Sequence, residues 1–283
     1  MAGDDLEQAG LKIRRYGSSG PTVLVLHGGP GAAGYMAPLA RALADEFRVL
    51  EPLQRRSGGE PLTVAGHVAD LHQVVESCEG SRPALVGHSW GAMLALAYAA
   101  AHPGRVAALA LVGGGTFDPV ARERLQATVE ERTDDGLRQR LERLAQETPD
   151  PDERLGQMGR LILPLYSYEL VPAGNEAEYY DARGHQETWA DMLRLQEEGL
   201  YPAAFTAIEA PVLMLHGTAD PPPGRMIQAS LRPYLPQLAY REWERCGHYP
   251  WLERAVRGEF LDVLRGWLAR QFAENGRTRQ QSA

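Results

Sequence analysis

The chain has 283 residues and a formal net charge of -8, with 44% hydrophobic and 23% charged residues. These proportions belong to a globular protein with a sizeable core, and the length suits one large domain or a domain with an inserted lobe. The acidic balance argues against a nucleic-acid binder, which usually presents a basic face. No apolar run approaches the roughly 20 residues that are needed to cross a bilayer.

The start of the chain and its cysteines indicate the compartment. The first residues, MAGDDLEQAG, are acidic and polar, unlike a secretory signal. Cys78 and Cys246 are the only cysteines, which excludes a disulfide framework and a cysteine-built zinc site. We therefore expect a cytoplasmic protein that binds neither nucleic acids nor membranes. The sequence does not predict its oligomeric state.

Short apolar runs alternate with helical stretches along most of the chain. Because Val- and Leu-rich strands followed by helices are typical of a parallel sheet covered on both faces, the alternation predicts an α/β fold. After an edge strand at Lys12–Tyr16, the predicted strands are Val23–Leu26, Phe47–Leu50, Ala84–Val86, Val106–Val112, Val212–Leu215 and Leu238–Trp243. The predicted helices are Tyr35–Ala44, Thr63–Cys78, Trp90–Ala101, Gly224–Leu235 and Leu252–Phe272, followed by a frayed tail from Asn275.

One stretch breaks this alternation. Residues 116–209 contain helical segments but no convincing strand. Asp118 and Pro119 suit the N-cap and the first position of the first of these helices. We interpret them as a helical cap inserted into a core made of residues 1–115 and 210–283. The cap holds 20 acidic residues against 10 arginines. These charges either solvate the outer faces of surface helices or form an entrance that favours a cationic substrate group.

The strongest chemical signal is Gly87-His88-Ser89-Trp90-Gly91, which lies between a predicted strand and a predicted helix. A G-x-S-x-G sequence at such a turn is typical of a nucleophile elbow. The turn is so sharp that the residues two positions away on each side must be small. This pattern predicts that Ser89 is a nucleophile at the carboxyl end of the sheet.

A serine hydroxyl needs a base that takes its proton. Of the eight histidines, His248 lies in the loop between the last predicted strand and the final helix. In hydrolases built on this elbow, the acid and then the histidine follow the serine along the chain, so His248 is the predicted base. His88 adjoins Ser89, and the sharp turn predicts that its side chain points away.

The acid should follow a strand between the serine and the histidine. Asp220 does so at the end of the segment that starts at Val212. Its predicted role is to orient the imidazole and stabilise its protonated form. Asp118 is the alternative, although capping a helix already accounts for it.

A tetrahedral intermediate also needs two amide donors for its oxyanion. We expect one from the backbone N–H of Trp90 and the other from Gly29, in the loop His27-Gly28-Gly29-Pro30-Gly31 that follows an early strand. Gly29 suits this role because a side chain there would obstruct the substrate.

The same loop supports a second hypothesis. Residues 29–34 fit G-x-G-x-x-G, and Glu51 lies after the next strand, which is the outline of a dinucleotide-binding unit. An NAD(P)-dependent oxidoreductase is therefore an alternative. It is weakened by Pro30, which lacks an N–H for a phosphate, and it leaves the elbow unexplained. A hydrolase-like protein that only binds a ligand is a third hypothesis.

Taken together, the segments His27–Gly31 and Gly87–Gly91 resemble the proline iminopeptidase branch of the α/β-hydrolase superfamily. The resemblance implies a mostly parallel eight-stranded sheet, a helical cap, no metal or organic cofactor, and removal of N-terminal proline from short peptides. One stretch departs from that branch, which usually carries Asp-Gln-Arg-Gly where this chain has Leu53-Gln54-Arg55-Arg56.

The resemblance also implies that cap carboxylates hold the terminal ammonium of the substrate. No spacing selects among the candidates, and each also suits a solvated surface. A carboxylic ester hydrolase that acts on small acyl esters with the same machinery is the close alternative. The candidate cap residues are Glu169, Glu176, Glu178 and Glu187.

Overall fold

A computed structural model describes residues 5–8, 10–78, 82–172 and 176–281. Its main feature is an eight-stranded sheet with the strand order β1-β2-β5-β3-β6-β7-β9-β10. The six strands from β5 to β10 run parallel, and β1 and β2 add an antiparallel edge. The strands are β1 (Asp5–Gln8), β2 (Leu11–Tyr16), β3 (Thr22–Leu26), β5 (Arg48–Pro52), β6 (Ala84–His88), β7 (Ala108–Val112), β9 (Val212–Gly217) and β10 (Leu238–Trp243).

The central strands are buried on both faces, as their continuous apolar runs predict. Successive side chains of a strand point to opposite faces, so neighbouring residues enter different cores. In β3, Leu24 and Leu26 join one hydrophobic cluster, whereas Val23 and Val25 join the other. The same alternation recurs in β6, where Leu85 joins the first cluster and Val86 joins the second. The mostly parallel sheet with helices on both faces is therefore confirmed.

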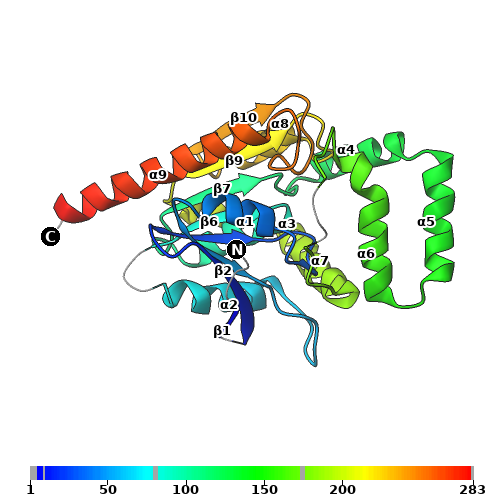
Figure 1. The fold of residues 1–283 in the computed structure, drawn as a ribbon, viewed down its shortest axis with the longest axis horizontal. Helices are drawn as coiled ribbons and strands as arrows, with labels where there is room; N and C mark the ends of the chain where they lie inside the picture. The colour runs from blue at the N-terminus through cyan, green and yellow to red at the C-terminus, as the bar shows by residue number, and fades with distance from the viewer. Residues whose placement is uncertain (1–4, 9, 79–81, 173–175, 282–283) are drawn as a thin grey trace.

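Two layers of helices cover this sheet (Figure 1). Residues of α2, α3 and α8 contribute to one cluster, and residues of α1 and α9 contribute to the other. Helix α3 is buried along most of its length, which explains its run of alanine and leucine. Of the helices that the structure describes, none is both long and apolar enough for a membrane span. Their bounds are α1 (Ala37–Leu43), α2 (Val64–Glu76), α3 (Trp90–Ala101), α8 (Gly224–Leu231) and α9 (Arg257–Gln281).

The segment between β7 and β9 is mainly helical. In Figure 1, α5 and α6 stand out to the side of the sheet, and α7 lies closer to it. Asp118 caps α4 by accepting the N–H groups of Val120 and Ala121, as its position before Pro119 predicts. The elements are α4 (Pro119–Arg132), α5 (Asp135–Glu147), α6 (Pro151–Ile162), the 3-10 helix η1 (Leu163–Tyr166), β8 (Tyr179–Tyr180), α7 (Ala182–Glu197) and the 3-10 helix η2 (Ala203–Ala207).

Three details differ from the expectations. β1 was not predicted, because the sequence DLEQ is polar and only its pairing with β2 makes it a strand. The two-residue strand β8 pairs with β4 (Ala32–Ala33), so the inserted segment contains a short strand after all. Helix α9 continues to Gln281 rather than fraying from Asn275. The Asn275 side chain donates to the carbonyl of Ala107 and so fixes the helix against the body.

Candidate active site

Ser89 occupies a sharp turn between β6 and α3. Its backbone has φ 54° and ψ -118°, a positive-φ conformation that a non-glycine residue rarely adopts. The Ser89 N–H donates to the carbonyl of Val112 at 2.9 Å, which ties the turn to the neighbouring strand β7. The side chain is therefore presented at the carboxyl ends of the parallel strands, where ligands of open α/β sheets bind.

The two glycines of the motif are required by space rather than by chain flexibility. A Cβ on Gly87 would lie 2.3 Å from the carbonyl oxygen of Gly91. A Cβ on Gly91 would lie 2.2 Å from the carbonyl oxygen of Leu26. In both cases the obstacle is backbone, which cannot rotate away. The spacing of the motif thus follows from how closely α3 approaches β3 and β6.

Replacing Gly91 by alanine should therefore destabilise the fold by about 3 kcal/mol, as overpacking against rigid neighbours does. Gly258 in α9 is a matched control, since a Cβ there meets nothing within 4 Å. Alanine at position 258 should be neutral or stabilise by up to about 1 kcal/mol. Urea unfolding of both variants measures the difference. Equal stability of the Gly91→Ala variant and the wild type would contradict the packing argument.

His248 and Asp220 lie together as the chain order predicts. The His248 Nδ1–H donates to the Asp220 carboxylate, at 2.8 Å to Oδ2 and 3.0 Å to Oδ1. Both side chains are buried, so this charge-assisted contact is shielded from water. The bond fixes the tautomer of His248 and leaves Nε2 as the nitrogen that can accept a proton. Asp118, the alternative acid, is engaged in capping α4.

Other buried histidines have structural partners. His27 donates from Nδ1 to the carbonyl of Gly28 and accepts the N–H of Gln54 at Nε2, and burial lowers its pKa to about 4. His216 donates to the carbonyl of Pro222 at 2.8 Å, with the Asp220 carboxylate 3.2 Å away, and burial lowers its pKa as well. Burial lowers the pKa of His67 to about 4, and its Nε2 contacts the hydroxyl of Thr188.

His88 has a position that sequence reasoning did not foresee. Its Nε2–H donates to the backbone carbonyl of His248 at 2.9 Å, and Nδ1 accepts the hydroxyl of Tyr35 at 2.5 Å. Tyr35 in turn accepts the N–H of Gly28 at 2.7 Å. Burial keeps the pKa of His88 well below its usual value, so the ring stays neutral. A buried chain of hydrogen bonds thus links the glycine-rich loop to the backbone of His248.

The glycine-rich loop lies against the elbow. Gly29 has φ 97°, a conformation that favours glycine. A Cβ on Gly28 would lie 2.7 Å from the Cβ of Ser89, so the loop passes directly beside the serine. Trp90 is anchored by its indole N–H, which donates to the buried amide oxygen of Gln54 at 2.8 Å. Gly29 and Trp90 line the same cavity as Ser89, and the role of their backbone amides stays a prediction.

A cavity of about 300 Å³ opens beside Ser89 and His248. The inserted segment supplies much of its wall, and no Asp, Glu, Lys or Arg lines it in the part of the chain that the structure describes. The Ser89 hydroxyl makes no hydrogen bond to a described residue, and such bonds often tighten only when substrate binds. The lining is Gly29, Pro30, Ser89, Trp90, Met93, Gly115, Gly159, Ile162, Leu163, Tyr166, His185, Trp189, His248 and Tyr249.

Helix α7 is fixed to the glycine-rich loop at its first turn. The Asp181 N–H donates to the carbonyl of Gly31 at 2.8 Å, and His185 Nδ1 contacts the carbonyl oxygen of Pro30 at 2.8 Å. A Cβ on Gly31 would lie 2.4 Å from the carbonyl oxygen of Asp181. The close approach of α7 therefore accounts for the glycine at position 31, without a bound phosphate.

Glu51, the acid of the dinucleotide hypothesis, is also unsuited to hold a ribose. It is fully buried, accepts the hydroxyl of Tyr16 at 2.8 Å and lies 3.7 Å from the Arg14 guanidinium. Burial raises its pKa to about 7. The structure therefore gives the dinucleotide hypothesis no support.

The four cap glutamates do not line the cavity, and each already has a partner. Glu169 pairs with Arg254, and Glu176 pairs with Arg41. Glu178 accepts from Lys12 at 2.6 Å and from Arg14 at 2.5 Å. Glu187 accepts the N–H of Leu62 and pairs with Arg183. The structure therefore does not bring these carboxylates to Ser89. They form ion pairs and hydrogen bonds with other segments of the chain instead.

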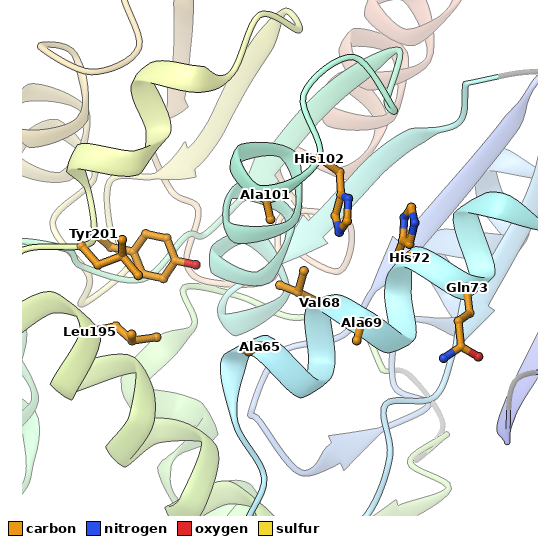
Figure 2. Close-up of a pocket in the computed structure, with 10 residues that line it drawn as sticks. Ala65, Val68, Ala69, His72, Gln73, Ala101, His102, Leu195 and Tyr201 are labelled. Atoms are coloured by element: carbon orange, nitrogen blue, oxygen red, sulfur yellow. The ribbon is translucent and has the colours of Figure 1, made fainter.

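A second cavity of about 500 Å³ lies elsewhere, between α2, the end of α3 and the end of α7 (Figure 2). Its wall includes Val68, Leu195 and Tyr201, and the imidazoles of His72 and His102 stack with their centres 4.0 Å apart. It shares no lining residue with the cavity at Ser89. Size does not select the candidate site, because the elbow and His248 line the smaller cavity.

The chain is similar to several known proteins. Residues 21–255 match the family model described as alpha/beta hydrolase fold. A 2-hydroxy-6-oxononadienedioate/2-hydroxy-6-oxononatrienedioate hydrolase of Pseudomonas putida is 28% identical and covers 87% of each chain. A proline iminopeptidase of Neisseria gonorrhoeae is 39% identical, but over only 33% of each chain. The crystal structure of VinJ superposes with a TM-score of 0.68 at 18% identity, covering 95% of this chain and 99% of that one. The chain therefore belongs to the alpha/beta hydrolase fold family.

Proposed function

We propose that the protein is a serine hydrolase in which Ser89, His248 and Asp220 form a catalytic triad. The observation that carries this proposal is the buried bond from His248 Nδ1 to Asp220, at a cavity that Ser89 also lines. Asp220 orients the imidazole and stabilises its protonated form, so that Nε2 can take the serine proton. The family assignment is in agreement with this chemistry, since relatives of this chain are hydrolases.

The proposed reaction is acyl transfer in two steps. Ser89 Oγ attacks the substrate carbonyl while His248 takes its proton, and the backbone amides of Gly29 and Trp90 stabilise the resulting oxyanion. His248 then protonates the leaving group as the acyl-enzyme forms. Water, deprotonated by the same histidine, attacks the ester carbon and releases the carboxylic acid, which restores Ser89. No step requires a metal or an organic cofactor.

The lining of the cavity favours a neutral, apolar acyl group. Ile162, Leu163 and Met93 supply aliphatic wall, and Trp189 and Tyr249 supply aromatic wall. A charged group bound there would lose its hydration without meeting an opposite charge, which is costly. We therefore propose carboxylic esters of small acyl groups as the first substrate class. The inserted segment, residues 116–209, acts as the cap that shapes this acyl site.

Proline iminopeptidase activity on short peptides is the second candidate. It is favoured by the motifs His27–Gly31 and Gly87–Gly91 and by the 39% identity to a proline iminopeptidase over a third of the chain. It requires an anionic partner for the terminal ammonium. Because none of the four cap glutamates reaches the cavity, a substrate-induced shift of the cap would have to supply that partner.

A side-by-side assay separates the two candidates. We expect p-nitrophenyl butyrate to be hydrolysed at least about 100-fold more efficiently than proline p-nitroanilide. One reason is that an aryl ester is intrinsically more reactive than an anilide, and the other is that an unpaired ammonium in a desolvated site costs a few kcal/mol. N-acetylproline p-nitroanilide is the matched control, since acetylation removes the charge. If the free amine is instead cleaved about 100-fold better than its acetylated form, the iminopeptidase candidate is correct. The Ser89→Ala variant should be inactive in every arm.

A further inference from the structure

The cap is joined to the loop that carries His248 by a short connecting segment. We call Tyr166–Val171, which begins at the last residue of η1, the strap. The His248 N–H donates to the Tyr166 carbonyl at 2.7 Å, and the Val171 N–H donates to the Leu252 carbonyl at 2.8 Å. Leu170 and Glu253 form an antiparallel bridge between these bonds. The strap therefore runs alongside the loop of residues 247–253, which we call the histidine loop, and is hydrogen-bonded to it at both ends.

One carboxylate lies at the centre of this junction. Glu253 is fully buried, and its two oxygens accept three backbone N–H groups. Oε1 accepts those of Gly247 and Tyr168, both at 2.8 Å, and Oε2 accepts that of Glu169 at 2.7 Å. A buried carboxylate is costly unless its oxygens are hydrogen-bonded, and bonds to charged acceptors are the stronger ones.

The three donors come from the two segments that shape the site. Gly247 directly precedes His248, and a Cβ on Gly247 would lie 2.3 Å from the Tyr166 carbonyl oxygen, so the loop and the strap are in close contact. Tyr166 lines the cavity, and its ring packs edge-on against the His248 imidazole with the ring centres 5.6 Å apart. A shift of Glu253 would therefore displace both the proposed base and one wall of the cavity.

We infer that Glu253 is a positioning residue that couples the cap to His248, by holding the strap and the histidine loop in one arrangement. This inference rests on the proposed function, because it assigns a consequence to the position of His248. Glu253 touches no reacting atom and acts only through the two backbones that it joins. No other side chain in the described residues receives amides from both segments.

The test replaces Glu253 by glutamine, which retains the size of the side chain but places an NH2 group where one of the amide donors needs an acceptor. We expect kcat for p-nitrophenyl acetate and for p-nitrophenyl butyrate to fall by about 10- to 100-fold, as for a misplaced catalytic group. The KM should rise more for the butyrate, because its longer acyl group reaches the wall that Tyr166 forms. Labelling of Ser89 by a fluorophosphonate should slow by a factor similar to that for kcat.

Two further variants keep the test decisive. Arg254→Ala removes the exposed contact between Arg254 and the Glu169 carboxylate across the same junction and should leave kcat within about twofold of the wild type. Glu253→Asp keeps the charge, but the shorter side chain cannot reach all three amides, so kcat should again fall. Thermal unfolding shows which variants are folded at the assay temperature.

A folded Glu253→Gln or Glu253→Asp variant with wild-type kcat would overturn the inference, and a lower melting temperature alone would then show a purely structural role. Failure of the proposed function itself has a different signature, namely a wild-type protein whose Ser89 does not react with the fluorophosphonate.

Discussion

Replacing Ser89 by alanine is expected to lower kcat for ester hydrolysis by about six orders of magnitude, as loss of a triad nucleophile does. Ser89 and His248 both line the cavity, and the bond to Asp220 orients the imidazole, as the proposed activation requires. Folding should be unaffected, because the Ser89 side chain makes no hydrogen bond to any residue that the structure describes. The measurement is turnover of p-nitrophenyl butyrate together with thermal unfolding.

Ser230→Ala serves as the control for that variant. The Ser230 hydroxyl donates to the carbonyl of Ile227 within α8, away from the cavity. Its removal should leave kcat unchanged. A Ser89→Ala variant that keeps more than about a hundredth of the wild-type rate would rule out Ser89 as the nucleophile.

Loss of His248 should be nearly as severe as loss of Ser89, since without the base the serine keeps its proton. Asp220→Asn is expected to lower kcat by about four orders of magnitude. An asparagine that offers its NH2 group to the imidazole favours the tautomer with the proton on Nε2, which cannot act as a base. Asp220 is buried, which keeps bulk water away from its bond to the imidazole.

Asp118→Asn is the matched control for the acid. Asp118 accepts two backbone N–H groups at the start of α4, and asparagine caps a helix about as well as aspartate does. The kcat of this variant should therefore equal that of the wild type. If Asp118→Asn were the more damaging of the two substitutions, Asp118 would be the acid and the proposed role of Asp220 would be wrong.

Much of the fold could be predicted because its signals are local. The parallel strands are apolar on both faces, so their sequences form continuous runs that stand out from the helices. Helix α3 begins at Trp90 and ends at Ala101, as predicted, because the elbow fixes its start and its alanine-rich sequence ends at His102. The polar strand β1 has no such signal, since only the neighbouring strand defines it.

The candidate site was predictable where backbone geometry restricts the residue type. The elbow needs glycine at positions 87 and 91 because backbone atoms lie where a Cβ would be. Cap residues carry no comparable signal. The sequence did not distinguish among four cap glutamates, and only the folded chain shows that they pair with other segments rather than face the cavity, namely Glu169, Glu176, Glu178 and Glu187.

His88 and Glu253 show why contacts that hold the site residues in place are hard to predict from the sequence. The sharp turn predicted only that the His88 side chain points away from Ser89, and it gave no sign of the bond to the His248 backbone, 160 residues further along the chain. Glu253 looks like one acid among many, and its three amide partners come from segments far apart in the chain. Such contacts depend on how the elements pack rather than on local pattern.

The central claim is that Ser89 is a nucleophile activated by His248, and covalent labelling tests it most directly. The wild-type protein and the His248→Ala variant should be treated with a fluorophosphonate and mapped by peptide mass spectrometry. We expect a single adduct on Ser89 in the wild type and little or none in the variant. An adduct on another residue, or no adduct in a preparation that hydrolyses esters, would contradict the account.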